Sequence, residues 1–242
     1  MTTIIHRTKL TLIGFALTGL FVGLGLWQLQ RAEANQAVLN KLMATMKQPP
    51  ATVKDINTPQ DWRFHLATLT GQFDNSRSFL LDNKTNKHRV GYEVYTPFTP
   101  DGSDQTFLVD RGFIPANPDR NVLPTIPAIA KTTTILGMLS LPPLGVTLGK
   151  VTDIKTTTWP QRIETLQLNN ISQTLNANLF PYVLMLAPQS PYAFDMEWKL
   201  TDTTPAQHRL YAAQWFALAL TLLLLSLAMN RNTEKKTRKQ VK

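Results

Sequence analysis

A histidine, a tyrosine and a tryptophan stand at the start of an apolar run near the end of the chain. His208, Tyr211 and Trp215 are spaced i, i+3 and i+7, which places their side chains on one face of a helix. A neutral imidazole is a common metal ligand, so His208 is the candidate metal site. The alternative is an aromatic belt, in which Tyr211 and Trp215 lie at the level of lipid headgroups and His208 is only hydrated.

Two apolar segments must position these residues. Residues 10–29 and 210–229 each have about the length that a helix needs to cross a bilayer core, so we expect two transmembrane helices. A cleaved signal peptide is the alternative for the first segment, although signal peptides have shorter apolar cores of about 7–15 residues. Gly19 and Gly23 form a small-xxx-small pair, and the expected partner of this pair is the second helix.

The net charge of +9 lies mainly near the two ends of the chain. Residues 31–209 hold 17 Lys and Arg against 15 Asp and Glu, a net of +2, while the N-terminal segment adds +2 and residues 230–242 add +5. Basic outer flanks follow the positive-inside rule and do not form a nucleic-acid footprint. We therefore expect a multi-pass protein of the bacterial inner membrane, or of the equivalent membrane of an organelle, in contact with membrane lipid. Residues 1–9 and 230–242 would be cytoplasmic, and the domain of residues 30–209 would be periplasmic.

Several classes of chemistry are excluded by what the sequence lacks. The chain has no cysteine, so it has neither disulfides nor thiolate metal sites. It contains no Gly-x-Ser-x-Gly, no His-Glu-x-x-His and no Walker loop. We therefore expect that it is not an enzyme.

The exported segment is predicted to be an α+β domain dominated by an antiparallel β-sheet or a partly open barrel. Six segments rich in β-branched and aromatic residues are expected as strands, namely residues 63–73, 79–82, 90–98, 106–111, 133–139 and 182–186. Residues 32–46 should continue the first helix into the domain, and a further helix is expected over 171–179 after the cap candidates Asn169 and Asn170. Residues 83–87 should form a turn, and the Pro-rich segment 123–130 a loop.

Trp27, Arg31 and Arg111 are the further candidates for a binding site. Trp27 and Arg31 lie at the exit of the first helix, so by symmetry they share a membrane face with the start of the second. Arg111 ends a strand just before Gly112, and an arginine held there could clamp a carboxylate. The commoner roles are a surface ion pair between Arg111 and Asp110 and a bulge or bend at Gly112.

Four motifs stand in order along the chain, namely Gly25-x-Trp27-Gln28-x-x-Arg31, Gly91-Tyr92-x-Val94-x-Thr96-Pro97-Phe98, Leu108-Val109-Asp110-Arg111-Gly112-Phe113-Ile114-Pro115 and His208-x-x-Tyr211-Ala212-x-x-Trp215-Phe216. Together they resemble the surfeit locus protein 1 (Surfeit) family of cytochrome c oxidase assembly factors. The resemblance covers essentially the whole chain. The family usually has Asn, Trp and Leu where this chain has Asp110, Phe113 and Arg209.

The resemblance implies a role in assembling heme-copper cytochrome c oxidase, with the catalytic subunit as partner and heme A synthase as a further candidate. Bacterial members are described as binding heme A, which implies reversible binding of this cofactor and help with its insertion into the catalytic subunit. On this interpretation His208 is the axial ligand, and Arg31 and Arg111 pair with the propionates. The rings that would cover the macrocycle are Trp27, Tyr211, Trp215 and Phe216. The alternative is a structural scaffold for oxidase subunits that binds no heme.

Overall fold

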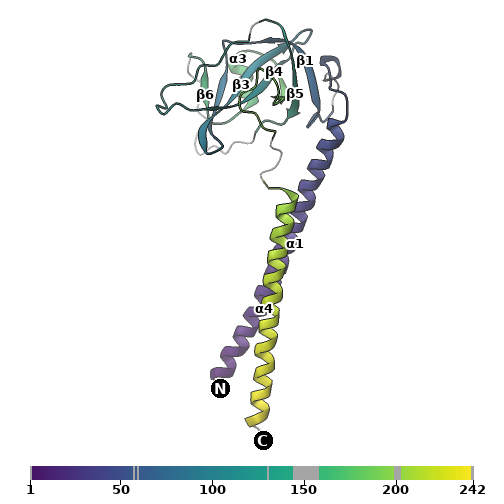
Figure 1. The fold of residues 1–242 in the computed structure, drawn as a ribbon, viewed down its shortest axis with the longest axis vertical. Coiled ribbons are helices and arrows are strands. Elements are labelled where there is room, and N and C mark those ends of the chain that lie inside the picture. Colours follow the sequence, from purple (N-terminus) through teal and green to yellow (C-terminus); the bar gives the residue numbers. More distant parts are fainter. Residues whose placement is uncertain are drawn as a thin grey trace. The chain divides into compact units, whose positions relative to one another are not determined.

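A computed structural model describes residues 2–56, 58, 60–129, 131–143, 158–198 and 203–240, with only the helical backbone described for residues 2–9 and 231–240. The chain divides into two compact units (Figure 1). One is a helix pair made of residues 1–40 and 199–242, and the other is a β-domain made of residues 41–198.

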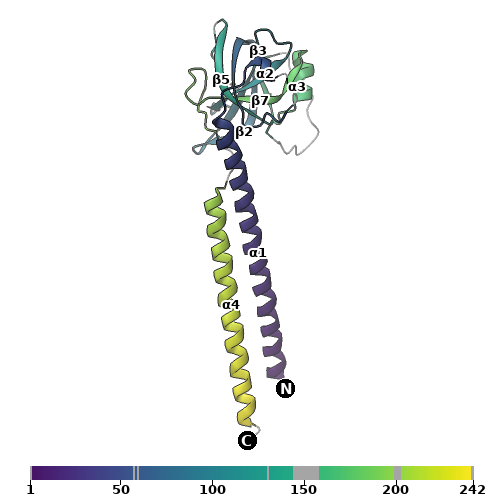
Figure 2. The ribbon, with the colours of Figure 1, turned by 90° about the vertical axis from the view of Figure 1, so that its right-hand side faces the viewer.

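The first unit pairs two long helices, α1 (Thr2–Met46) and α4 (Pro205–Gln240), which run antiparallel and side by side (Figure 2). Their apolar stretches have a mean hydropathy of 1.9 each, and only 11% and 17% of the residues in them are buried. Leucines and other large apolar side chains therefore face outward, which suits lipid rather than water. Both expected helices are confirmed as long and apolar enough to cross a membrane, and α1 continues through residues 32–46 as expected.

On each of α1 and α4, one row of shielded residues follows alternating steps of three and four positions. On α1 the row is Gly14, Thr18, Phe21, Gly25, Gln28, Ala32 and Asn35; on α4 it is Pro205, His208, Ala212, Trp215, Ala219, Leu222 and Ser226. This heptad spacing is that of two helices packed as a coiled coil, and we refer to these two rows as the seam. Small residues on the seam let the helices approach closely, because Gly14 faces Ser226 and Gly25 faces the ring of Phe216.

Gly19 and Gly23 are not part of the seam. A Cβ atom added at either position would meet nothing within 4 Å, whereas at Gly25 it would lie 2.6 Å from the Phe216 ring. The expectation that this pair contacts the second helix is therefore wrong. The heptad spacing turns positions 14, 18, 21 and 25 inward, which leaves positions 19 and 23 facing outward.

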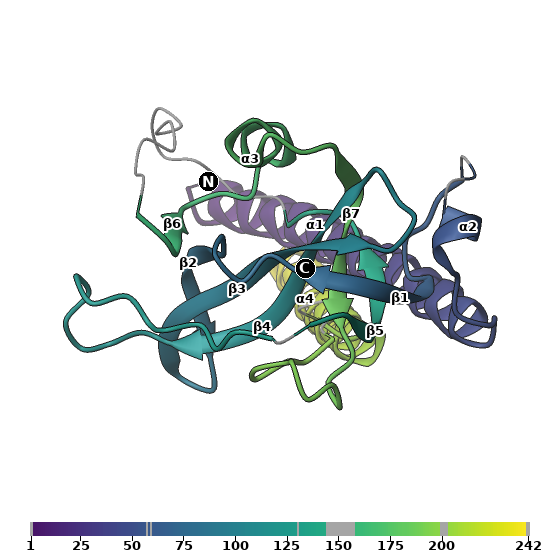
Figure 3. The same ribbon diagram turned by 90° about the horizontal axis from the view of Figure 1, so that it is seen from above.

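The second unit holds, within the described ranges, seven strands, the short helix α2 (Val53–Ile56) and the helix α3 (Leu168–Leu175). The strands are β1 (Leu66–Phe73), β2 (Phe79–Asn86), β3 (Arg89–Pro100), β4 (Thr106–Pro115), β5 (Thr133–Ser140), β6 (Gln161–Ile163) and β7 (Leu179–Leu186). Strands β1, β5, β7, β4 and β3 pair in that order, and β3 pairs back with β1, so these five form a closed barrel (Figure 3). Strand β2 pairs with β3, and β6 adds to β2.

The predicted β-rich domain is thus confirmed, with differences in how its strands pair. The barrel is closed because β1 and β3 approach at Gly71, where a Cβ atom would lie 2.2 Å from the carbonyl oxygen of Thr99. Most neighbouring strands are antiparallel, but β4 and β7 are parallel and so are β2 and β6. Strand β6 was not expected, because three residues carry too little periodicity to predict a strand.

Residues with left-handed backbone angles set several element boundaries. Phe64 has φ of 70°, so β1 begins at Leu66 instead of residue 63. The segment 83–87 is largely strand and not turn, because Asn83, with φ of 58°, forms a bulge and β2 continues to Asn86. The chain then turns at Lys87 and His88, which also have positive φ.

The α3 helix lies a few residues earlier than expected. It begins after Gln167, so Asn169 and Asn170 lie inside it and are not caps. It ends at Asn176, whose left-handed conformation terminates the helix before Leu179 starts β7. The Pro-rich segment forms a loop over residues 123–129, as expected, while Ala130 lies outside the described residues.

Strand β4 is buried from Thr106 to Phe113 because the sheet around it is covered on both faces. Val109 points into the barrel interior with Leu69 and Leu184. Leu108 packs on the opposite face under α3, against Ile171 and other apolar residues. This continuous burial is what brings an aspartate and an arginine into the interior at the next two positions.

Filling the seam at Gly25 should separate the helix pair. In Gly25→Leu the new side chain would overlap the Phe216 ring, so we expect a loss of about 1–3 kcal/mol in the stability of the pair. Gly23→Leu is the matched control, because nothing lies within 4 Å of a Cβ atom there. Thermal unfolding of the full chain in detergent, followed by Trp fluorescence, measures both variants, and an equal effect of the two would contradict the seam.

Candidate functional site

The first turn of α4 is built to hold His208 in place. Thr204 and Gln207 form a reciprocal capping box: the Gln207 side-chain oxygen accepts the Thr204 backbone N–H at 2.8 Å, and the Thr204 hydroxyl oxygen accepts the Gln207 N–H at 3.2 Å. Pro205 occupies the first helical position, where its missing N–H costs nothing. The Asn35 amide of α1 also donates to the Thr203 carbonyl at 2.8 Å, which ties the helix start to α1.

His208 is hydrogen-bonded across the seam to Gln28. Its Nδ1 lies 2.7 Å from the Gln28 Oε1, which can only accept a hydrogen bond, so Nδ1 carries the proton. In the neutral imidazole Nε2 then keeps its lone pair, and no described residue hydrogen-bonds to it. An imidazole whose Nδ1–H is bound by a carbonyl oxygen and whose Nε2 is free is the usual arrangement of a metal ligand.

The aromatic candidates divide between the seam and the outer surface of the helix pair. Trp215 lies on the seam, with its ring centroid 5.4 Å from that of Phe21, and Phe216 covers Gly25. Tyr211 is 45% exposed, one turn beyond His208. The structure therefore does not place His208, Tyr211 and Trp215 on one free face, because helix packing occupies Trp215.

Trp27 and Arg31 form a pair at the same level of the helix pair. Trp27 is 49% exposed, and the Arg31 guanidinium carbon lies 5.7 Å from its ring centroid. Because Gln28 contacts His208 and Gly25 contacts Phe216, this part of α1 runs beside the start of α4. The exit of the first helix and the start of the second thus lie side by side, as expected from the sequence.

Arg111 belongs to the interior of the β-domain. It is 3% exposed, and its guanidinium donates to the carbonyl oxygens of Tyr192 at 3.0 Å and Pro127 at 3.3 Å. The ring centroid of Phe194 lies 4.7 Å away. Burial lowers the pKa of Arg111 to about 10. These contacts give Arg111 a structural role. Arg111 is therefore not proposed as a partner of a propionate.

Asp110 is buried beside Arg111 but does not pair with it. Strand β4 has one extra residue against β3 at this point, and Gly112, with φ of 97°, completes the bulge. The Asp110 carboxylate accepts the Gly112 N–H at 2.8 Å and lies opposite Tyr95 on β3. Burial, followed by the negative charge of Glu93, raises the pKa of Asp110 to about 7. The strand thus continues past the expected end at Arg111 to Pro115, and the bulge that was the commoner expectation for Gly112 is confirmed.

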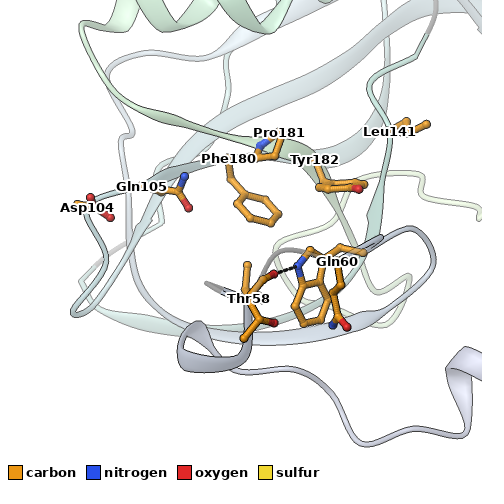
Figure 4. Close-up of a pocket in the computed structure, with 10 residues that line it drawn as sticks. Thr58, Gln60, Asp104, Gln105, Leu141, Phe180, Pro181 and Tyr182 are labelled. Atoms are coloured by element: carbon orange, nitrogen blue, oxygen red, sulfur yellow. Dashed lines mark hydrogen bonds between the residues drawn. The ribbon is translucent and has the colours of Figure 1, made fainter.

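A wide groove of about 890 Å³ opens on the β-domain (Figure 4). Phe180 and Tyr182 from β7 form one wall, and Thr58 and Gln60 lie across from them. The indole N–H of Trp62, also in the lining, donates to the Thr58 carbonyl at 3.2 Å. The groove offers apolar area and amide groups, and Asp104 is the one carboxylate among its described lining residues.

The described residues contain no group of three or more His, Cys, Asp and Glu side chains that could hold a metal ion. His65, for which a strand position was expected, lies just before β1, with its ring 5.2 Å from that of Trp62. His208 therefore offers a single nitrogen ligand, which suits a metal that brings its other ligands with it.

The role of Gln28 was not expected from the sequence. The sequence contained a signal for it, since Gln28 and His208 both belong to the ordered motifs. The capping box Thr204-x-x-Gln207 was also readable in the sequence. The contact between Gln28 and His208 was not, because the helix register that creates it joins residues 180 positions apart.

A pair of long apolar helices joined to a closed β-barrel domain defines a membrane protein with one large domain between two candidate spans. Its family follows from comparison with models of known families, of which the SURF1 family model matches residues 15–220. The chain belongs to the SURF1 family.

Two curated relatives align along nearly the whole chain, and a third aligns with part of it. A SURF1-like protein of Rickettsia felis is 26% identical over 219 residues, covering 88% of this chain and 93% of the relative. A SURF1-like protein of Rickettsia conorii is 24% identical over 229 residues, covering 92% of each chain. The cytochrome oxidase assembly protein SHY1 of Saccharomyces cerevisiae is 25% identical over 103 residues, which is 41% of this chain and 26% of the yeast protein.

Removing the charge at position 110 should change how stability depends on pH. Because the pKa of Asp110 is higher in the folded chain than its ordinary 3.8, the contribution of this group to stability is fully present below about pH 4 and is lost as the pH rises through 7. Asp110→Asn avoids this loss and should be more stable than wild type by about 2–4 kcal/mol above pH 7, with the difference vanishing toward pH 4. Denaturation from pH 4 to 8 tests this, with exposed Asp104→Asn as the control. A pH-independent difference would contradict it.

Arg111→Lys keeps the positive charge but loses the planar fork that reaches two carbonyl oxygens. We expect the β-domain to lose about 2–3 kcal/mol, because buried hydrogen bonds from a charged group are broken. The surface variant Arg63→Lys should cost about 1 kcal/mol or less, since Arg63 pairs with Asp61 in water. Denaturant unfolding compares the two, and an unchanged midpoint for Arg111→Lys would remove its structural role.

Proposed function

We propose that this chain assists the assembly of cytochrome oxidase, and that it does so by binding heme A reversibly through His208. Membership of the SURF1 family supports the assembly role, as does similarity to a yeast protein named for cytochrome oxidase assembly. The observation that carries the cofactor part is the bond from His208 Nδ1 to Gln28, which leaves Nε2 free to act as a ligand.

The residues around His208 fit an iron porphyrin in three respects. A neutral imidazole nitrogen is a common axial ligand of heme iron. Exposed Tyr211 and Trp27 offer ring surface that a flat macrocycle could cover, at the level where α1 and α4 meet. Arg31 supplies a cation beside Trp27 that could pair with a propionate.

Release is as important as binding for an assembly factor. When bound, the heme would supply an iron centre that accepts one protein nitrogen. The chain's contribution is to hold that nitrogen in a fixed orientation and to offer apolar rings. One protein ligand at an open site binds less tightly than two ligands in a closed pocket, which favours transfer to another protein. We infer that the receiver is the catalytic subunit of the oxidase.

The proposed topology places both termini in the cytoplasm and the β-domain in the periplasm of a bacterium. The basic residues beyond each apolar stretch support this orientation. It puts the start of α4, with His208, at the periplasmic side of the membrane, which is where we propose that heme A is received and passed on.

A purified sample tests the heme proposal directly. The full chain, isolated in detergent from cells that make heme A, should carry a Soret band, and His208→Ala should weaken or shift it because the axial nitrogen is lost. His88→Ala is the matched control, since His88 lies in the β2–β3 turn of the other unit. An unchanged spectrum in His208→Ala would exclude His208 as the ligand.

A structural scaffold that binds no heme is the second candidate. The observation in its favour is that His208 and Trp215 both lie on the seam, where they contact Gln28 and Phe21 and hold the helices together. A scaffold predicts copurification of oxidase subunits with a chain that carries no heme. Measuring subunits and heme in the same preparation separates the two candidates.

A further inference from the structure

We propose that Gln28 is a positioning residue for His208: it fixes the tautomer and the orientation of the imidazole, and so prepares Nε2 for a metal that arrives with its own ligands. This inference deepens the proposed function and rests on it for the identity of the ligand. The tautomer itself is a property of the chain alone and can be tested without heme.

The contact has the geometry of a fixed hydrogen bond. Gln28 Oε1 and His208 Nδ1 are 2.7 Å apart, and both side chains lie on the seam in a half-buried setting. The two neutral tautomers of imidazole interconvert freely in water, and a hydrogen bond at one ring nitrogen decides which nitrogen keeps the lone pair. A carbonyl acceptor at Nδ1 therefore leaves the lone pair on Nε2.

The seam keeps both partners of this bond in place. One turn before Gln28, Gly25 lets the ring of Phe216 approach α1. On α4, the Thr204–Gln207 capping box fixes the turn that contains His208. A polar pair inside an apolar helix interface also favours one register over others, because any shift would leave both groups unpaired.

The surroundings select a class of ligand. A bare zinc ion needs about three or four protein ligands, and the described residues bring no such group together. A metal held in a planar macrocycle needs one axial nitrogen and apolar ring surface, which Nε2 and the exposed Tyr211 supply. We therefore expect the site to bind a metalloporphyrin and to ignore free Zn²⁺.

Nitrogen NMR of the heme-free protein tests the tautomer. The full chain would be labelled with ¹⁵N-histidine and studied in detergent, with the His208 signals assigned by their loss in His208→Ala. We expect the proton on Nδ1 in wild type, a shift toward Nε2 in Gln28→Met, which removes the acceptor, and a return to Nδ1 in Gln28→Glu, which restores one. A wild-type proton on Nε2, or a Gln28→Met spectrum equal to wild type, would overturn the proposal, and the wild-type spectrum alone decides if Gln28→Met does not fold.

Gln30→Met is the matched control, because Gln30 is exposed two positions along the same helix. It should leave the His208 tautomer unchanged. In heme titrations Gln28→Met should weaken binding about 10–100-fold, the usual effect of losing such a partner, and Gln30→Met should not. Addition of Zn²⁺ alone should leave the His208 signals in place, and a specific shift of Nε2 by Zn²⁺ would overturn the ligand class.

The two proposals fail in different ways. If His208 carries its proton on Nδ1 but His208→Ala binds heme as wild type does, the tautomer assignment stands and the heme proposal fails. If His208→Ala loses heme but Gln28→Met changes neither tautomer nor affinity, His208 stays as the ligand and Gln28 has no positioning role.

Discussion

Close packing of α1 against α4 along the seam is the constraint on which the candidate site depends. Small residues at Gly14, Gly25 and Ala212 bring the two backbones together, and this approach is what allows Gln28 to reach His208. The same packing takes Trp215 away from the outer surface by placing it against Phe21. One interface thus decides which polar groups meet and which rings stay free.

The β-domain buries two successive ionisable residues, Asp110 and Arg111. At the β4 bulge, Asp110 is satisfied by the Gly112 N–H on one face, and Arg111 by two carbonyl oxygens on the other. Because these carbonyls belong to separate loops, Arg111 connects the loops at residues 127 and 192 to the barrel. A residue that looked like a ligand clamp in the sequence is therefore better explained as part of the core.

The candidate site combines a fixed imidazole with aromatic rings that stay exposed. Gln28 and the capping box at Thr204 hold His208, so binding a ligand through Nε2 requires little further ordering of the chain. Tyr211 and Trp27 stay exposed, and Arg31 keeps its charge beside Trp27. In the proposed function, such a site would be prepared before its ligand arrives and would be open enough to release it to an oxidase subunit.

The sequence by itself determined the class of the protein. Apolar length predicted α1 and α4, alternating β-branched and aromatic residues predicted six of the strands, and ordered motifs identified the family, because each of these signals is local or additive along the chain. Only the tertiary structure decided that the barrel closes between β1 and β3, that Gly14 and Gly25 form the seam while Gly19 and Gly23 do not, that Arg111 is buried, and that Gln28 is the partner of His208. These outcomes depend on register between segments far apart in sequence, and a shift of one residue would turn each side chain to another face.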